Sequence, residues 1–132
     1  MKHLTHEKGD FGGAMVQANL IGKGYNVFIP VSSACPFDLV VLIGSDFKRI
    51  QVKYVTSKNQ SICVSSRRAI RNGRAKFNTN IEFDILAIYC PCNNECYYVY
   101  RSEFSETITL RLIHAKNNQT KNIRLASGYL DL

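Results

Sequence analysis

The sequence from Pro36 to Tyr54 reads PFDLVVLIGSDFKRIQVKY and predicts the centre of the fold. Two runs rich in β-branched and aromatic residues flank a Gly-Ser pair at positions 44 and 45, which is typical of a β-hairpin turn. With the turn at these two residues, Ile43 pairs with Asp46. Side chains alternate between the two faces of a strand. One face of the hairpin is therefore aliphatic, with Leu39, Val41, Ile43, Ile50 and Val52.

The opposite face of this hairpin carries polar side chains. The same register sets Asp38 opposite Gln51 and places Lys53 two residues further along the same face. Directly opposed residues in an antiparallel pair have Cβ atoms about 5 Å apart, so we expect a carboxylate, an amide and an ammonium group to converge. A slip of one residue would bury Asp38 among the aliphatic side chains, which disfavours the other register.

Such a polar patch suits the metal-assisted hydrolysis of a phosphodiester bond. Asp38 and Gln51 both offer hard oxygen ligands, as Mg²⁺ prefers. Lys53 could hold a phosphate oxygen or help to deprotonate an attacking water. The alternative is an exposed Asp–Lys pair on a solvated sheet face, which contributes under about 1 kcal/mol to stability. The spacing alone favours this alternative, and only the surrounding residues change that.

The composition is that of one globular domain over residues 1–132. Apolar residues make up 45% of the chain and charged residues 20%, and this length is enough to bury a core. No apolar run approaches a membrane span, and no apolar signal core follows the first methionine, so we expect a cytoplasmic protein without membrane contact. The net charge of +7 suits an anionic partner, with nucleic acid as the first candidate, although excess charge also serves solubility.

Three of the five cysteines, Cys90, Cys92 and Cys96, form the only cysteine cluster in the sequence. Zinc sites usually combine two pairs of ligands with C-x₂₋₄-C spacing, and no second pair is present. Cys92 and Cys96 flank an expected hairpin tip and could face each other across it. In a reducing cytosol we expect these residues to remain free thiols.

The remaining elements follow from local patterns. Apolar residues recur at helical spacing between Thr5 and Lys23, and Gly24 follows as a helix terminator. Along the rest of the chain we predict a strand over Tyr25–Ile29, a loop over Pro30–Pro36, strands over Phe83–Tyr89, Tyr97–Tyr100 and Thr107–Ile113, a polar turn over Ala115–Thr120 and a short helix over Lys121–Tyr129.

The segment from Tyr54 to Asn80 reads as irregular and polar, and it concentrates positive charge. No acidic residue lies among its five cations, so the segment is a candidate phosphate-binding surface. An ordinary solvated loop is the alternative. The five cations are Arg67, Arg68, Arg71, Arg74 and Lys76.

Several segments of the chain resemble one nuclease family. They are Lys8–Val16 with Gly24–Val27, Pro36–Asp38 with Arg49–Lys53, Phe83–Pro91, and near the C-terminus Leu110–Leu112, Ala115–Gln119 and Ile123–Ala126. In this order they resemble the group I intron-associated homing endonucleases of the PD-(D/E)XK superfamily, which are related in fold to archaeal Holliday junction resolvases and restriction endonucleases. The resemblance implies an α/β fold with a restriction-endonuclease-like core, in which a mixed β-sheet is flanked by helices and the first helix packs beside the hairpin.

The resemblance also implies roles for the polar residues of the hairpin. Asp38 would ligate a divalent metal, Mg²⁺ or in its place Mn²⁺. Gln51 and the backbone carbonyl of Val52 would assist as ligands, and Lys53 would be the catalytic lysine.

One position departs from the family pattern, because relatives carry a glutamate where this chain has Gly13. Asp10 lies one helical turn earlier and Gln17 one turn later, near the same helix face. Either residue could compensate for the missing carboxylate. Without compensation, the enzyme would be weakened or inactive.

The function implied by the resemblance is that of a metal-dependent endonuclease that cuts double-stranded DNA and serves intron homing. Two strand scissions and a long target favour a homo-oligomer, either a dimer or a homotetramer built as a dimer of dimers. We expect its contact surfaces on Tyr97–Tyr100 and Leu125–Leu132, although the same residues could close the core. The alternative functions are a DNA-binding protein with a nuclease fold that has lost cleavage, and a Holliday junction resolvase-like nuclease.

Overall fold

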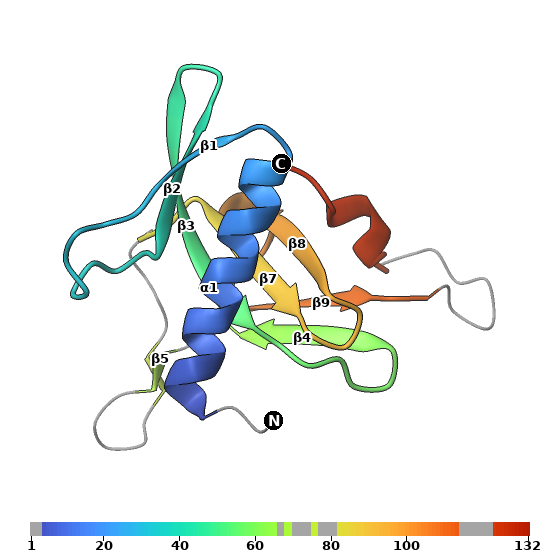
Figure 1. The fold of residues 1–132 in the computed structure, drawn as a ribbon. Helices are drawn as coiled ribbons and strands as arrows, with labels where there is room; N and C mark the ends of the chain where they lie inside the picture. Colours follow the sequence, from blue (N-terminus) through green and yellow to red (C-terminus); the bar gives the residue numbers. More distant parts are fainter. Residues whose placement is uncertain (1–3, 66–67, 70–74, 77–81, 114–122) are drawn as a thin grey trace.

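A mixed five-stranded sheet forms the centre of the protein (Figure 1). The structure is a computed structural model, and it describes residues 4–65, 68–69, 75–76, 82–113 and 123–132. The strands lie in the order β1-β2-β3-β7-β8, and every neighbouring pair is antiparallel except β3 with β7. Their bounds are β1 Asn26–Phe28, β2 Leu39–Ile43, β3 Asp46–Tyr54, β7 Ile85–Cys90 and β8 Glu95–Tyr100.

The central hairpin has the register that the sequence predicts. Strands β2 and β3 pair with Ile43 opposite Asp46 and Leu39 opposite Ile50. In the turn, Gly44 has a φ of +63°, a conformation that glycine adopts at low cost. The aliphatic face is buried as predicted, at Leu39, Val41 and Ile50.

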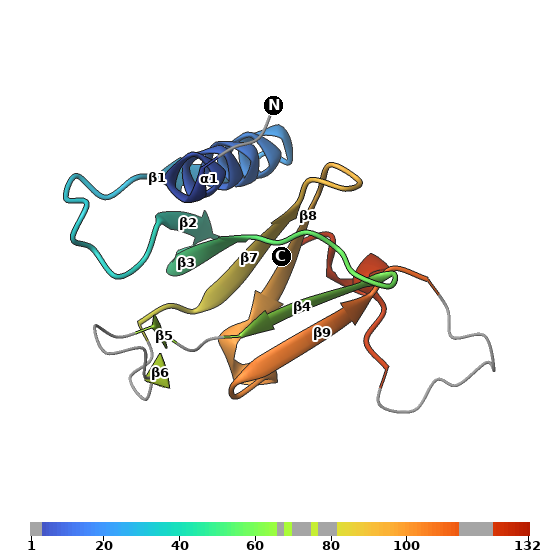
Figure 2. The same ribbon diagram turned by 90° about the horizontal axis from the view of Figure 1, so that it is seen from below.

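Helix α1 (Thr5–Gly22) lies across one face of this sheet (Figure 2). Its own residues Val16 and Leu20 are fully buried against the sheet, and Gly24 follows its end with a φ of +94°, as predicted. At Gly12 the helix approaches β3 closely, because a Cβ atom placed there would lie 3.4 Å from the Cβ atom of Tyr54. The first helix therefore packs directly on the strand of the hairpin, as predicted.

The other face of the sheet is covered by two strands, β4 (Ser61–Ser65) and β9 (Thr107–Arg111), which pair with each other (Figure 2). The mixed sheet and the α/β class are confirmed, but within the described residues the only α-helix lies on the first face. The prediction that Tyr54–Asn80 is irregular is wrong over β4. Its sequence, Ser-Ile-Cys-Val-Ser, alternates as a strand does, and Ile62 and Val64 are buried against the main sheet.

The crossover from Val55 to Asp84 connects the parallel neighbours β3 and β7. It contains β4 and a second short antiparallel pair, β5 (Arg68–Ala69) with β6 (Ala75–Lys76). The chain therefore leaves the sheet after β3 and returns beside it, and the predicted cationic segment lies within this excursion.

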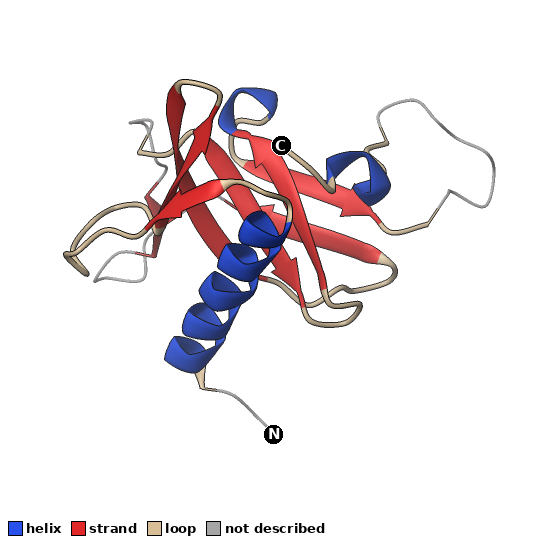
Figure 3. Ribbon diagram, turned by 45° about the horizontal axis from the view of Figure 1, so that its top comes forward, coloured by secondary structure: helices blue, strands red, loops and turns tan. Residues whose placement is uncertain are grey.

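The C-terminal region departs from the prediction of a helix over Lys121–Tyr129. Leu125 forms a parallel bridge with Arg111, and a short 3₁₀ helix, η2 (Ala126–Tyr129), follows it (Figure 3). Ala126 is buried. The chain conformation here therefore follows from packing against the core and not from the helical pattern of the sequence. The predicted turn over Ala115–Thr120 lies outside the described residues. Another 3₁₀ helix, η1 (Arg101–Glu103), follows β8.

Strand β8 is buried in the core of one chain. Tyr97, Tyr98 and Val99 are each less than 5% exposed, so these three residues cannot form the subunit contact surface that was predicted on this strand. The hydroxyl of Tyr98 donates a hydrogen bond of 2.6 Å to the side-chain oxygen of Asn19 on α1, and burial raises the pKa of Tyr98. The alternative that these aromatic residues fill the core is the one observed.

All five cysteines are free. Cys90 and Cys96 are buried in separate core clusters, while the exposed Cys92 accepts a hydrogen bond from the backbone N–H of Ser57 at 3.4 Å. Cys96 pairs with Tyr89 inside the sheet, so Cys92 and Cys96 do not face each other across the hairpin tip. None of the helices among the described residues has the length and apolar character that a membrane span requires.

An ion pair joins the residue before β7 to β3. The carboxylate of Asp84 accepts a hydrogen bond of 2.8 Å from the backbone N–H of Arg49. It also accepts bonds of 3.1 Å and 3.0 Å from the Nε and Nη2 atoms of the same residue. Such a two-pronged pair is stronger than a single hydrogen bond, and it lowers the pKa of Asp84 below its ordinary value.

Replacing Asp84 by asparagine is expected to lower the free energy of unfolding by about 1–3 kcal/mol at neutral pH, because hydrogen bonds to a charged group are lost. Since the folded pKa is lowered, the stabilisation is fully present above the unfolded pKa of about 4 and is lost as the pH falls through the folded pKa. In urea unfolding, the difference between wild type and Asp84→Asn should therefore narrow in acid. Asp46→Asn, at the exposed hairpin turn, is the control, and a difference that stays constant with pH would contradict the prediction.

Candidate active site

Strand β3 continues past the end of its partner β2. The last pair of the ladder joins Leu39 to Ile50, whereas β3 runs on to Tyr54. Beyond this pair, the side chain of Asp38 takes the place of a strand partner for β3. Its Oδ2 atom accepts a hydrogen bond of 2.8 Å from the backbone N–H of Val52. Its own N–H donates to the carbonyl oxygen of Ile50 at 2.9 Å. The hairpin register therefore fixes the Asp38 carboxylate at the part of β3 that extends beyond β2, which we call the sheet edge.

The backbone carbonyl of Val52 faces the same edge. The N–H and C=O groups of a strand residue point to the same side of the strand, and the N–H of Val52 points to Asp38. The edge thus presents carboxylate and carbonyl oxygens together, and the role of both as metal ligands remains a prediction.

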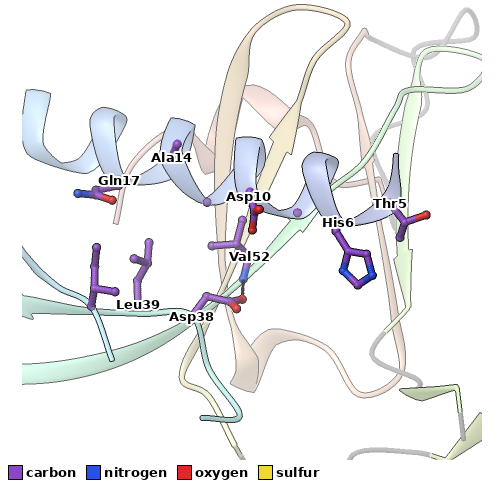
Figure 4. Close-up of a pocket in the computed structure, with 11 residues that line it drawn as sticks. Thr5, His6, Asp10, Ala14, Gln17, Asp38, Leu39 and Val52 are labelled. Carbon is purple, nitrogen blue, oxygen red and sulfur yellow. Dashed lines mark hydrogen bonds between the residues drawn. The ribbon is translucent and has the colours of Figure 1, made fainter. Parts of the chain in front are cut away.

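A pocket of about 560 Å³ lies between helix α1 and this edge (Figure 4). Its sheet side contains Asp38 and Val52, and Gly13 belongs to its helix side. The position at which the resemblance implies a glutamate therefore faces the same space as Asp38. The described residues that line it are Thr5, His6, Gly9, Asp10, Gly13, Ala14, Gln17, Ile29, Asp38, Leu39 and Val52.

Gln51 and Lys53 lie on the face of β3 opposite to α1. They alternate along the strand with residues that pack toward the helix. Their partners on β7, Leu86 and Ile88, belong to the core cluster on the far side. The prediction that Gln51 and Lys53 share one face is confirmed.

Asp38 does not share that face, contrary to the prediction. It lines the pocket on the helix side together with Val52, and neither Gln51 nor Lys53 is part of that lining. The reason is that Asp38 precedes β2, so strand alternation does not direct its side chain. The hydrogen bond from Val52 directs it instead.

The predicted DNA-binding cations are only partly covered by the structure. Arg67, Arg71 and Arg74 lie outside the described residues. Arg68 and Lys76 are backbone partners in the short pair of β5 and β6. The DNA-binding role of all five cations remains a prediction.

A family model described as PD-(D/E)XK endonuclease matches residues 3–132 of the sequence. The chain belongs to the PD-(D/E)XK endonuclease family. Among solved structures, a bacterial homing endonuclease, I-Ssp6803I, is similar with a TM-score of 0.73 and 21% identity, over 96% of this chain and 88% of that chain. At this identity the likeness concerns the fold alone, which is restriction-endonuclease-like. No match is found among curated proteins.

PD-(D/E)XK nucleases generally use divalent metals, and the edge of this family member offers suitable ligands. In the described part of the chain, the side-chain oxygen of Gln51 is buried without a hydrogen-bond partner. A buried oxygen left unpaired costs about 1–3 kcal/mol and is commonly explained by a water or an ion. The oxygens of Asp38 and Val52 lie on the pocket side of β3 and that of Gln51 on its opposite face, and all three are hard donors of the kind that Mg²⁺ and Mn²⁺ prefer. The residues present therefore fit a divalent metal.

His6 also lines the pocket of this PD-(D/E)XK protein, although it was not among the predicted site residues. Its spacing of four from Asp10 places both on one helix face, and this spacing was the available signal. Among the described residues, however, no group of three His, Cys, Asp or Glu side chains is arranged to hold a metal ion. A metal here would depend on backbone and amide oxygens and on water as well as on carboxylates.

Proposed function

We propose that this PD-(D/E)XK protein is a metal-dependent endonuclease that hydrolyses phosphodiester bonds in double-stranded DNA, acting in the cytoplasm in intron homing. The observation that supports this most is the position of Asp38. Its carboxylate is fixed at the sheet edge by the N–H of Val52 at 2.8 Å, next to the strand that carries Gln51 and Lys53.

In this proposal Asp38, the carbonyl of Val52 and the side chain of Gln51 would hold Mg²⁺ or Mn²⁺. The metal would supply Lewis-acid activation of the phosphate and of the attacking water. Lys53 holds a phosphate oxygen as an ammonium cation, or as a neutral amine it accepts a proton from the attacking water. The cationic side chains of the crossover hold the DNA backbone, because phosphate contacts position a duplex without reading its sequence.

Incubation with a library of random duplexes tests this function. We expect cleavage in Mg²⁺ or Mn²⁺, no cleavage in a chelator, and binding without cleavage in Ca²⁺. Sequencing of the cut ends would then reveal the target.

A second candidate function is DNA binding without cleavage, and it is favoured by the glycine at position 13. Binding in Ca²⁺ with no cleavage in Mg²⁺ or Mn²⁺ would support this second candidate. Preferential cutting of four-way junctions would instead indicate a resolvase-like nuclease.

The salt dependence of DNA binding is expected to report the cationic segment. If Arg67, Arg68, Arg71 and Arg74 each contact one phosphate, the slope of log K against log salt should be about −3.6, because each contact contributes about −0.9. Replacing two of these arginines by glutamine should reduce the slope by about half. Fluorescence anisotropy in Ca²⁺ measures it, and an unchanged slope would place the DNA surface elsewhere.

Assembly into a dimer or a dimer of dimers is expected, because one chain has one candidate active site and a double-strand break needs two scissions. Static light scattering of the free protein, and of its complex with DNA in Ca²⁺, measures the mass. A mass of one chain under both conditions would contradict the homing-endonuclease proposal. The single-strand nicking of DNA would then be the expected activity.

A further inference from the structure

Gly13 leaves an open position in the wall of the pocket. A Cβ atom built at Gly13 meets no heavy atom within 4 Å, and the residue lines the same pocket as Asp38. The helix carboxylate that the resemblance implies at this position is missing, and no described neighbour fills its space. Asp38 is then the only carboxylate among the residues assigned so far to the metal site.

Two polar side chains of the same helix face lie on either side of this open position. Asp10 precedes Gly13 by one helical turn and Gln17 follows it by one turn, and both line the pocket. Asp10 points from α1 toward the sheet edge where Asp38 meets Val52, whereas Gln17 lies further along the helix near Leu39 (Figure 4). The structure therefore distinguishes between the two residues, and Asp10 is the one beside Asp38.

The charges of Asp10 and Asp38 are not offset by a protein cation within the described ranges. Asp38 accepts the N–H of Val52, and neither carboxylate forms an ion pair there, unlike Asp84 with Arg49. A divalent cation in the pocket that both carboxylates line would be attracted to each of them. Gln51 lies on β3 between the two residues that bond Asp38. Its side-chain oxygen, on the opposite face of the strand, is also buried without a partner.

We propose that Asp10 takes the place of the missing glutamate as the helix carboxylate of the divalent-metal site. This inference rests on the proposed nuclease function. It concerns Mg²⁺ or Mn²⁺, because all of the protein donors are oxygens. Mg²⁺ usually binds through one or two carboxylates and keeps several waters, so Asp10 and Asp38 are sufficient without a third acidic ligand. The metal then links α1 to the edge of the sheet.

Calorimetric titration of the full chain with Mn²⁺ alone, without DNA, tests the role of Asp10. Asp10→Asn is expected to weaken Mn²⁺ binding by about tenfold or more, since even supporting groups around a metal change its affinity by about 10–100-fold. Gln17→Ala is expected to leave the affinity unchanged. Gly13→Glu, added to the Asp10→Asn variant, is expected to restore the affinity, because the new side chain enters open space.

Two comparisons separate this role from general effects of charge and stability. Asp46→Asn removes the same charge from the exposed hairpin turn, and it should leave Mn²⁺ binding unchanged. Thermal unfolding without metal should be the same for Asp10→Asn and wild type, because the side chain of Asp10 forms no hydrogen bond or ion pair with another described residue.

If Asp10→Asn binds Mn²⁺ like the wild type while Asp38→Asn loses affinity, the role of Asp10 is overturned and the proposed function stands. An equal loss in Asp46→Asn and Asp10→Asn would also overturn the role of Asp10. If Asp38→Asn binds Mn²⁺ like the wild type as well, both the role of Asp10 and the proposed metal-dependent function are overturned.

Discussion

Replacing Asp38 by asparagine is expected to reduce DNA cleavage by about a hundredfold or more and to weaken Mg²⁺ and Mn²⁺ binding sharply. A catalytic metal supplies several kcal/mol of transition-state stabilisation, and each 1.4 kcal/mol changes the rate tenfold. The substitution removes one negative charge at nearly constant size. The amide oxygen can still accept the hydrogen bond that Val52 now donates to Oδ2 at 2.8 Å, so the sheet edge should remain folded.

The control for Asp38→Asn is Asp46→Asn, which makes the same change of charge at the exposed turn of the same hairpin. Single-turnover cleavage with excess protein measures the rate, and calorimetry measures the metal affinity. If Asp38→Asn binds metal as tightly as Asp46→Asn does, the metal site lies elsewhere.

Replacing Lys53 by methionine is expected to lower the cleavage rate by about 10²–10⁴-fold, the range typical of a lost general acid or base. Metal binding should persist, because a cation has been removed and not a ligand. Methionine preserves the apolar stem of the half-buried Lys53 side chain, so the packing next to Ile88 on β7 should change little.

Lys48→Met is the matched control for Lys53→Met, because it removes the same charge from the same strand. Cleavage by Lys48→Met should stay at the wild-type rate. A Lys53→Met variant that cleaves like Lys48→Met, or that loses metal affinity together with cleavage, would contradict a catalytic role of Lys53. Should the wild type not cleave, the comparison is made in the Gly13→Glu variant.

The parts of the fold that the sequence predicted are those that local chemistry specifies. The Gly-Ser turn and the alternation on both sides of it set one register, and the structure has that register between Ile43 and Asp46. The helix that precedes it ends at Gly22, just before Gly24, whose φ of +94° suits glycine. The position of Asp38 beside the hairpin followed from the same register.

The parts that were not predicted depend on contacts between distant segments. Strand β4 pairs with β9, so that Ser61 lies opposite Arg111, and no local pattern shows which partner a short strand will find. The direction of the Asp38 side chain depends on the backbone N–H of Val52, which donates a hydrogen bond to it. This N–H has no partner on β2, because β2 stops before β3 does. The prediction for Lys121–Tyr129 failed because Ala126 docks into the core.

The parallel pairing of β3 with β7 has an evolutionary consequence. The chain between Tyr54 and Ile85 leaves the sheet and returns to it. This excursion contains the cationic segment, and none of its described residues lines the pocket. Lengthening a flexible connection costs only about 0.6 kcal/mol per doubling of its length. If the proposed function holds, insertions and substitutions in the crossover can therefore change how such a protein grips the DNA backbone across generations, while the hairpin inherits its chemistry unchanged.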